Sequence, residues 1–81
     1  MITCSEYDHI EIVCLYHYPI EISLKSGKVL TCIAIDTKRN IDRMECIEVD
    51  VRGDTQLVLL DNIAKLVVTI ENPHFIKVIF D

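Results

Sequence analysis

The sequence predicts a mostly β protein, a small bent antiparallel barrel of five to six strands behind one N-terminal α-helix. Valine and isoleucine are abundant and alanine is scarce, which suits the pleated, half-buried surface of a sheet. From Ile20 onward, apolar residues alternate with polar ones in short runs separated by turn residues. With 81 residues, the chain is expected to form a single domain, 1–81, with one modest core and little room for a deep substrate cleft.

The helix is expected over about residues 5–17. Ser5 can cap its N-terminus, and Asp8 places negative charge in the first turn, where the helix dipole favours it. Pro19 ends the helix, because it forces Tyr18 towards extended geometry. An alternating strand through Ile10 is the other interpretation of this segment, but the capping residues and the length favour a helix.

Two faces of this helix separate when successive residues are placed about 100° apart. The first is expected to dock on the sheet and consists of Tyr7, Ile10, Val13, Cys14 and His17. The opposite face carries Asp8, Glu11, Ile12, Leu15 and Tyr16. Its mixture of carboxylates and apolar side chains is found on ordinary exposed helices and on binding surfaces alike, so both interpretations stay open.

The strands are expected between about residues 20 and 80, and turn residues divide them. The expected strands are residues 20–25, 28–36, 43–51, 55–60, 63–71 and 74–80. Turns or loops are expected at 26–27, 37–40, 52–54, 61–62 and 72–73. Within the third strand the apolar pattern changes phase between Cys46 and Ile47, which suggests a bulge or sharp bend there.

The charge distribution points to a basic protein partner. The net charge is −5, and no Lys or Arg precedes Lys25. Proteins that bind nucleic acid usually show the opposite balance, because phosphate contacts supply most of their affinity. The first residues do not form a signal peptide and no run is long enough to span a membrane, so we expect a soluble, cytoplasmic protein without a membrane partner.

The cysteines and carboxylates do not predict a metal site or any cofactor. The four cysteines contain no C-x-x-C pair and no ligand-spaced histidine. We expect Cys14, Cys32 and Cys46 to pack in the core and Cys4 to lie near the exposed terminus. The carboxylates of the third strand, Glu45, Glu48 and Asp50, are expected to be solvated.

Catalysis is not expected. Cys14 and His17 are three residues apart and could form a nucleophile and a base, as in a small hydrolase or redox enzyme. Both, however, lie on the helix face that is predicted to be buried. That alternative requires an exposed Cys14 thiol, whereas His17 is better explained as a cap for the last helix carbonyls.

Residues 4–14, C-S-E-Y-D-H-I-E-I-V-C, resemble the opening of the Rof/YaeO family of Rho-specific inhibitors of transcription termination. That family begins with a pattern close to C-D-D-Y-D-N-L-E-L-A-C. The residues that match outright are Cys4, Tyr7, Asp8, Glu11 and Cys14. The resemblance continues through the hairpin at 25–27, the segment 38–40, the turn at 53–55 and the run 57–63, and it covers nearly the whole chain.

The resemblance implies an Sm-like fold and a protein that binds the N-terminal RNA-binding domain of Rho, where it blocks RNA loading and inhibits Rho-dependent termination. The implied contacts are the helix residues Glu6, Tyr7, Asp8 and Glu11 and the loop residues Lys38, Arg39 and Asn40. We expect no direct contact with nucleic acid and a monomer when the protein is free. The alternative is an Sm-like RNA-binding module, against which the acidic charge argues.

Overall fold

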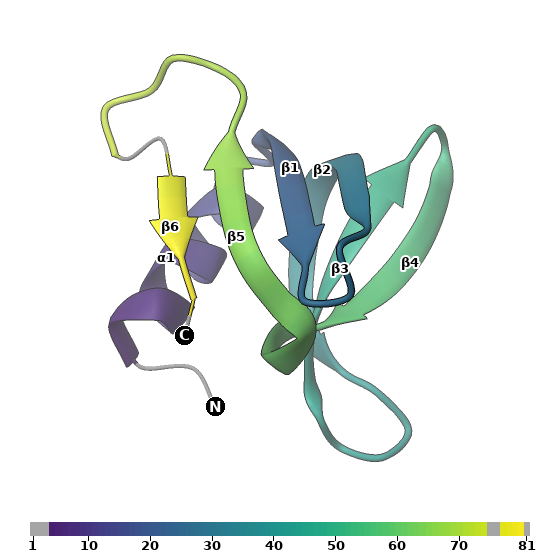
Figure 1. Cartoon of the computed structure of the whole chain (residues 1–81). Helices are drawn as coiled ribbons and strands as arrows, with labels where there is room; N and C mark the ends of the chain where they lie inside the picture. Colours follow the sequence, from purple (N-terminus) through teal and green to yellow (C-terminus); the bar gives the residue numbers. More distant parts are fainter. Residues whose placement is uncertain (1–3, 75–76, 81) are drawn as a thin grey trace.

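The computed structural model describes residues 4–74 and 77–80, and in these it places one α-helix before six strands (Figure 1). The elements are α1 (Cys4–Leu15), β1 (Pro19–Leu24), β2 (Val29–Arg39), β3 (Glu45–Val51), β4 (Asp54–Leu59), the 3₁₀ turn η1 (Leu60–Asn62), β5 (Ile63–Val68) and β6 (Lys77–Ile79). The predicted mostly β chain with an N-terminal helix is confirmed. The last strand begins at Lys77 and not at 74, and residues 75 and 76 lie outside the described residues.

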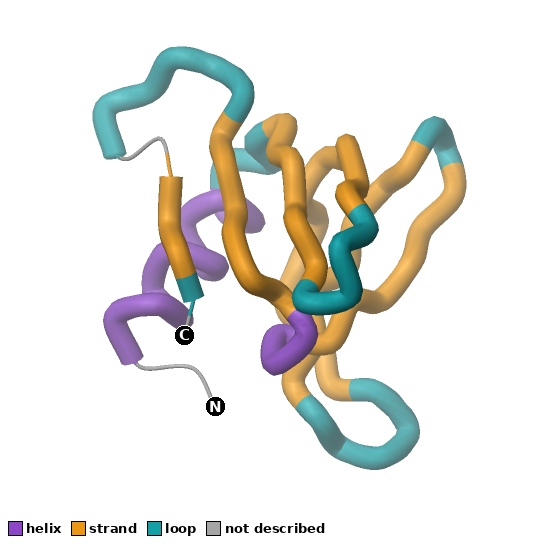
Figure 2. Tube along the Cα trace, viewed as in Figure 1, coloured by secondary structure: helices purple, strands orange, loops and turns teal. Residues whose placement is uncertain are grey.

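All strand pairs are antiparallel, and the six strands form one curved sheet in the order β4-β3-β2-β1-β5-β6 (Figure 2). Among the described residues no pairing joins β4 to β6, so the expected bent barrel takes the form of a curved sheet that is not closed. The strand at one edge, β6, pairs with β5 from Lys65↔Ile79 to Val67↔Lys77. The helix lies behind β5 and β6 in this view and packs against β2.

The expected phase change in the third strand is wrong. The pairing of β3 with β4 is regular from Cys46↔Leu59 to Val51↔Asp54, and Ile47 and Val49 both face the core. Cys46 is buried on the other face, because the preceding loop covers it: its Sγ donates to the Met44 carbonyl at 3.5 Å. The irregularity lies in β2, where the register with β3 shifts between Ala34 and Asp36.

This bulge lets β2 bend and continue beyond its expected end. The sequence predicts a loop at residues 37–40, but β2 pairs with β3 through Thr37↔Ile47, Lys38↔Cys46 and Arg39↔Glu45. Three of the four expected loop residues therefore belong to a strand. The loop begins only at Asn40.

The helix docks through Ile10, Val13 and Cys14, which are buried in the main core. Tyr7 is half-buried against the same core, as expected. His17, expected on this buried stripe, is exposed because the helix has already ended at Leu15. At the other end the helix already includes Cys4, so Ser5 lies inside the first turn and not at the cap.

The C-terminus of α1 ends in a Schellman motif. The N–H of Tyr18 donates to the Val13 carbonyl at 3.0 Å, and the N–H of His17 donates to the Cys14 carbonyl at 3.2 Å. His17 occupies the left-handed position of the motif, with φ of 49°, where glycine is the commonest residue. His17 does cap the helix carbonyls, as expected, and it does so through its backbone.

Replacing His17 by glycine should stabilise the fold. An L-residue in the left-handed region costs roughly 1–2 kcal/mol, and the extra freedom of glycine in the unfolded chain offsets part of the gain. We expect the free energy of unfolding to rise by about 0.5–1 kcal/mol in His17→Gly but not in His17→Ala. Urea unfolding followed by circular dichroism measures this, and a glycine variant less stable than the parent would contradict it.

Candidate protein-binding surface

The outer face of α1 presents the predicted helix residues. Asp8 and Glu11 are exposed, while Glu6 and Tyr7 are half-buried. Since Asp8 and Glu11 are three residues apart, they project from one side of the helix, opposite the buried Ile10 and Val13. The carboxylate of Glu6 stands in the first turn, where the helix dipole stabilises negative charge.

The predicted residues of the second region have structural partners of their own. Lys38 Nζ lies 3.3 Å from Glu48 Oε2, and Arg39 Nη2 lies 3.9 Å from Glu45 Oε1. The side-chain oxygen of Asn40 accepts hydrogen bonds from backbone N–H groups of the loop that follows. Lys38 and Arg39 therefore end β2 with their charges partly balanced, and Asn40 organises the loop.

A shallow hollow of about 230 Å³ joins the two regions. Tyr7 of the helix lines it together with Thr37, Lys38 and Arg39 of β2 and Glu45 of β3. The structure thus brings the helix and the end of β2 into one continuous surface, although about thirty residues separate them in the sequence.

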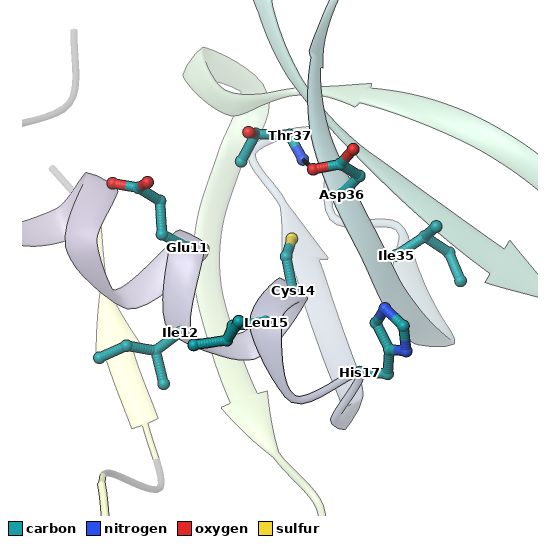
Figure 3. A pocket seen from close by; sticks show the side chains of 8 residues that line it. All are labelled: Glu11, Ile12, Cys14, Leu15, His17, Ile35, Asp36 and Thr37. Atoms are coloured by element: carbon teal, nitrogen blue, oxygen red, sulfur yellow. Dashed lines mark hydrogen bonds between the residues drawn. The ribbon is translucent and has the colours of Figure 1, made fainter.

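A larger hollow of about 500 Å³ lies between the C-terminal half of α1 and the bulged part of β2 (Figure 3). Its apolar wall is Ile12, Leu15 and Ile35, and its carboxylates are Glu11 and Asp36. The N–H of Thr37 donates to Asp36 Oδ1 at 2.8 Å, which fixes the carboxylate of Asp36. An apolar wall with two carboxylates suits the aliphatic stem and cationic head of a lysine or arginine.

The thiol of Cys14 points into the space between α1 and β2 (Figure 3). Burial, and then the negative charges of Asp36 and Glu11, raise its pKa to about 12. Burial likewise raises the pKa of Cys32 to about 11. Because the thiolate is the nucleophilic form, Cys14 is poorly suited to attack at neutral pH.

Asp36 and Ile35 are members of the surface that the sequence did not identify. The sequence predicts both at the end of a strand, where an alternating pattern places one of them on the core face. The bulge at Ile35 changes this, and a bulge leaves no distinct signal in a run of aliphatic residues.

Cys14, Cys32 and Cys46 are buried and Cys4 is exposed, as the sequence predicts, and all four are free thiols. Within residues 4–74 and 77–80, no three side chains of His, Cys, Asp or Glu are grouped so that they could hold a metal ion. In the same residues, no helix is both long enough and apolar enough to cross a membrane.

The exposed acidic face of α1, bordered by two hollows, has the charge and the shape to meet a basic surface on another protein. The family model described as "Modulator of Rho-dependent transcription termination (ROF)" matches residues 1–80, so the chain belongs to the ROF family. This confirms the resemblance of its opening residues. The family is therefore one that regulates transcription termination by Rho.

Individual relatives of this chain also carry names from this family. The proteins named "Protein rof" from Escherichia coli (strain K12) and Shigella flexneri are each 33% identical over 64 residues, which cover 76% of this chain and 73% of theirs. A solved structure titled "YaeO bound to Magnesium from Vibrio cholerae O395" has 37% identity and a TM-score of 0.88, and the match covers 93% of this chain and 97% of that one.

The raised pKa of Cys14 predicts a loss of stability at high pH. The thiol has a pKa of about 12 in the folded protein against 9.0 as the ordinary value, so above pH 9.0 the unfolded chain releases a proton that the folded chain retains. Stability should be intact below pH 9.0 and fall as the pH rises towards 12. In Cys14→Ala this fall should be shallower. Urea midpoints at several pH values measure it, and equal slopes in the two proteins would contradict it.

Proposed function

We propose that this protein binds the N-terminal RNA-binding domain of Rho in the bacterial cytoplasm, blocks RNA loading there and so inhibits Rho-dependent termination. The observation that carries the proposal is the outward projection of Asp8 and Glu11 from a helix whose opposite side is locked into the core. Membership of a family that modulates Rho-dependent termination supports Rho as the partner.

Electrostatic complementarity supplies the mechanism. A site that binds RNA is rich in Lys and Arg, which phosphates neutralise. The carboxylates of Glu6, Asp8 and Glu11 offer negative charge to the same side chains, and they do so from a rigid helix. An acidic helix that occupies this site therefore excludes RNA from it.

Apolar contact area accompanies the charge. Leu15, the last residue of α1, is 73% exposed, and Tyr16, which follows it, is 52% exposed. The ring of Tyr16 stacks on Tyr18 and on His74, with centroids 5.4 and 4.9 Å apart, so its orientation is fixed before binding. Exposed side chains that are already ordered lose little entropy when they are buried in an interface. In the hollow beside Leu15, Glu11 and Asp36 can receive a basic side chain of the partner.

Direct RNA binding and catalysis fit the surface less well. Lys38 and Arg39 lie at the edge of the proposed surface, but carboxylates of β3 stand 3.3 and 3.9 Å from them, so their attraction for phosphate is weakened. The buried, protonated thiol of Cys14 does not suit nucleophilic chemistry. We propose a non-enzymatic protein, monomeric when free, that acts by occupying a site.

Reversing the charges of the helix face should abolish function and leave the fold intact. In Asp8→Lys/Glu11→Lys both changes are at exposed positions, so the circular dichroism spectrum should match that of the parent. Each charged hydrogen bond lost costs roughly 1.5–3 kcal/mol, and repulsion adds to this, so affinity for Rho should fall about a hundredfold or more. Binding to purified Rho and readthrough of a Rho-dependent terminator are the two measurements.

A control variant with the same net charge separates the effect of charges on α1 from the effect of the total charge of the protein. Asp54→Lys/Glu71→Lys makes the same change of net charge, from −5 to −1 because each substitution adds two charges, at exposed positions outside α1. This control should bind Rho nearly as well as the parent. If the helix variant folds normally and binds like the parent, the helix is not the binding surface.

The rate of association should depend on salt. The attraction between the acidic groups of this protein and a basic surface speeds association. Salt weakens this attraction at a distance, because the screening length falls to about 8 Å at physiological ionic strength. We expect stopped-flow association with Rho to slow as salt rises, while dissociation changes less. Association rates that stay the same from low to moderate salt would rule out electrostatic steering.

A further inference from the structure

The loop between β2 and β3 carries an apolar side chain in an unusual place. Ile41 is 97% exposed, the largest exposed fraction among the large hydrophobic residues that the structure describes. The loop, residues 40–44, projects away from the sheet at the bottom of the view in Figure 1. Full exposure of one isoleucine contributes nothing to the stability of the fold, since its apolar surface stays in water.

The loop that presents Ile41 is held by its own hydrogen bonds. Asn40 Oδ1 accepts from the N–H of Asp42 at 2.9 Å and from the N–H of Met44 at 3.0 Å. The backbone N–H of Asn40 donates to the Met44 carbonyl at 3.1 Å, and the N–H of Arg43 donates to the Asn40 carbonyl at 2.9 Å. An exposed side chain on an ordered loop loses little backbone entropy on binding, which is the condition that a binding anchor requires.

From this geometry we propose that Ile41 is an apolar anchor that inserts into an apolar hollow on the protein that α1 binds, and that Asn40 positions it. The inference rests on the proposed function and deepens it by naming a contact in the second region. Apolar anchors surrounded by polar groups account for much of the energy of protein interfaces.

The outer face of α1 and the loop that carries Ile41 are connected by one surface, so a single partner can contact both. Lys38 and Arg39, which lead into the loop, line the hollow of about 230 Å³ together with Tyr7 of α1. A partner that covers the acidic helix face and extends across this hollow therefore reaches the base of the loop.

Protein is the partner class that the chemistry of the loop favours. Asp42 and Arg43, which follow the anchor, carry one charge of each sign, so the loop at 40–44 has no net attraction for phosphate. Isoleucine also lacks the ring needed to stack on a base and the polar groups needed to bond its edge. The expected site on the partner is an apolar hollow with a polar rim of both charges.

The test replaces Ile41 by serine and measures binding to purified Rho. Ile70→Ser is the matched control, because Ile70 is also an exposed isoleucine outside a strand, at 50% exposure, in the loop after β5. We expect Ile41→Ser to fold like the parent and to bind about tenfold more weakly. Ile70→Ser should keep parental affinity.

The outcomes separate this inference from the proposed function. If Ile41→Ser binds like the parent while Asp8→Lys/Glu11→Lys loses binding, the anchor is wrong and the helix surface stands. If the helix variant also binds normally, the proposed function itself fails. Binding of a labelled RNA to the parent protein without Rho, with loss of that binding in Ile41→Ser, would overturn the choice of a protein partner.

The positioning role of Asn40 has its own readout. Asn40→Ala removes the acceptor for two backbone N–H groups, so hydrogen exchange at Asp42 and Met44 should accelerate and affinity should fall. Asn40→Asp keeps an acceptor oxygen and should restore both. Faster exchange in Asn40→Ala without loss of affinity would show that the order of the loop is irrelevant to binding.

Discussion

The docking of α1 on the curved sheet determines which helix side chains are available to a partner. Ile10 and Val13 have no exposed surface and Cys14 has almost none, so the helix cannot rotate about its axis without moving a core side chain into water. Burying such a side chain contributes about 1.5–3 kcal/mol, which makes the orientation energetically defined. The acidic groups face outward because the apolar ones must face inward. The Schellman motif at His17 and Tyr18 then returns the chain to the sheet within a few residues.

The second constraint is the bend in β2, which makes one strand serve both parts of the proposed surface. The bulge at Ile35 turns the strand, so that Asp36 borders the larger hollow beside the helix. Beyond the bulge, β2 stays paired with β3 to Arg39, and this pairing carries the chain out to the loop that presents Ile41. A shorter β2 would leave the loop without its support. The helix hollow and the loop are therefore related by the geometry of a single strand.

Much of this arrangement follows from local sequence signals. Alternation of apolar residues predicts the strands, and the helical spacing of Ile10, Val13 and Cys14 predicts the docked face of α1. Glycine at 53 predicts the tight turn between β3 and β4, in which Arg52 and Gly53 have positive φ and Asp50 Oδ1 accepts the Gly53 N–H at 2.7 Å.

What the sequence could not predict depends on long-range contacts. The extent of β2 depends on pairing with β3, which overrides the polar character of Lys38 and Arg39. The burial of Cys46 on the outer face depends on a loop that folds over it, so the apolar pattern suggested a phase change where none exists. The open form of the sheet depends on which strands pair at long range, which the local pattern does not reveal. Ile41 is exposed in a loop that the side chain of Asn40 holds together, whereas residue type alone would place an isoleucine inside.

The most direct test of the central claim is a map of the contact surface on this protein. Backbone amide spectra of the labelled protein, recorded with and without the isolated N-terminal domain of Rho, report which residues change environment. The account predicts that the changes gather on the outer face of α1 and on residues 38–44, with β4 and the exposed side of β5 unaffected. Changes that gather on β4 or on the β5–β6 edge, with α1 unaffected, would contradict it.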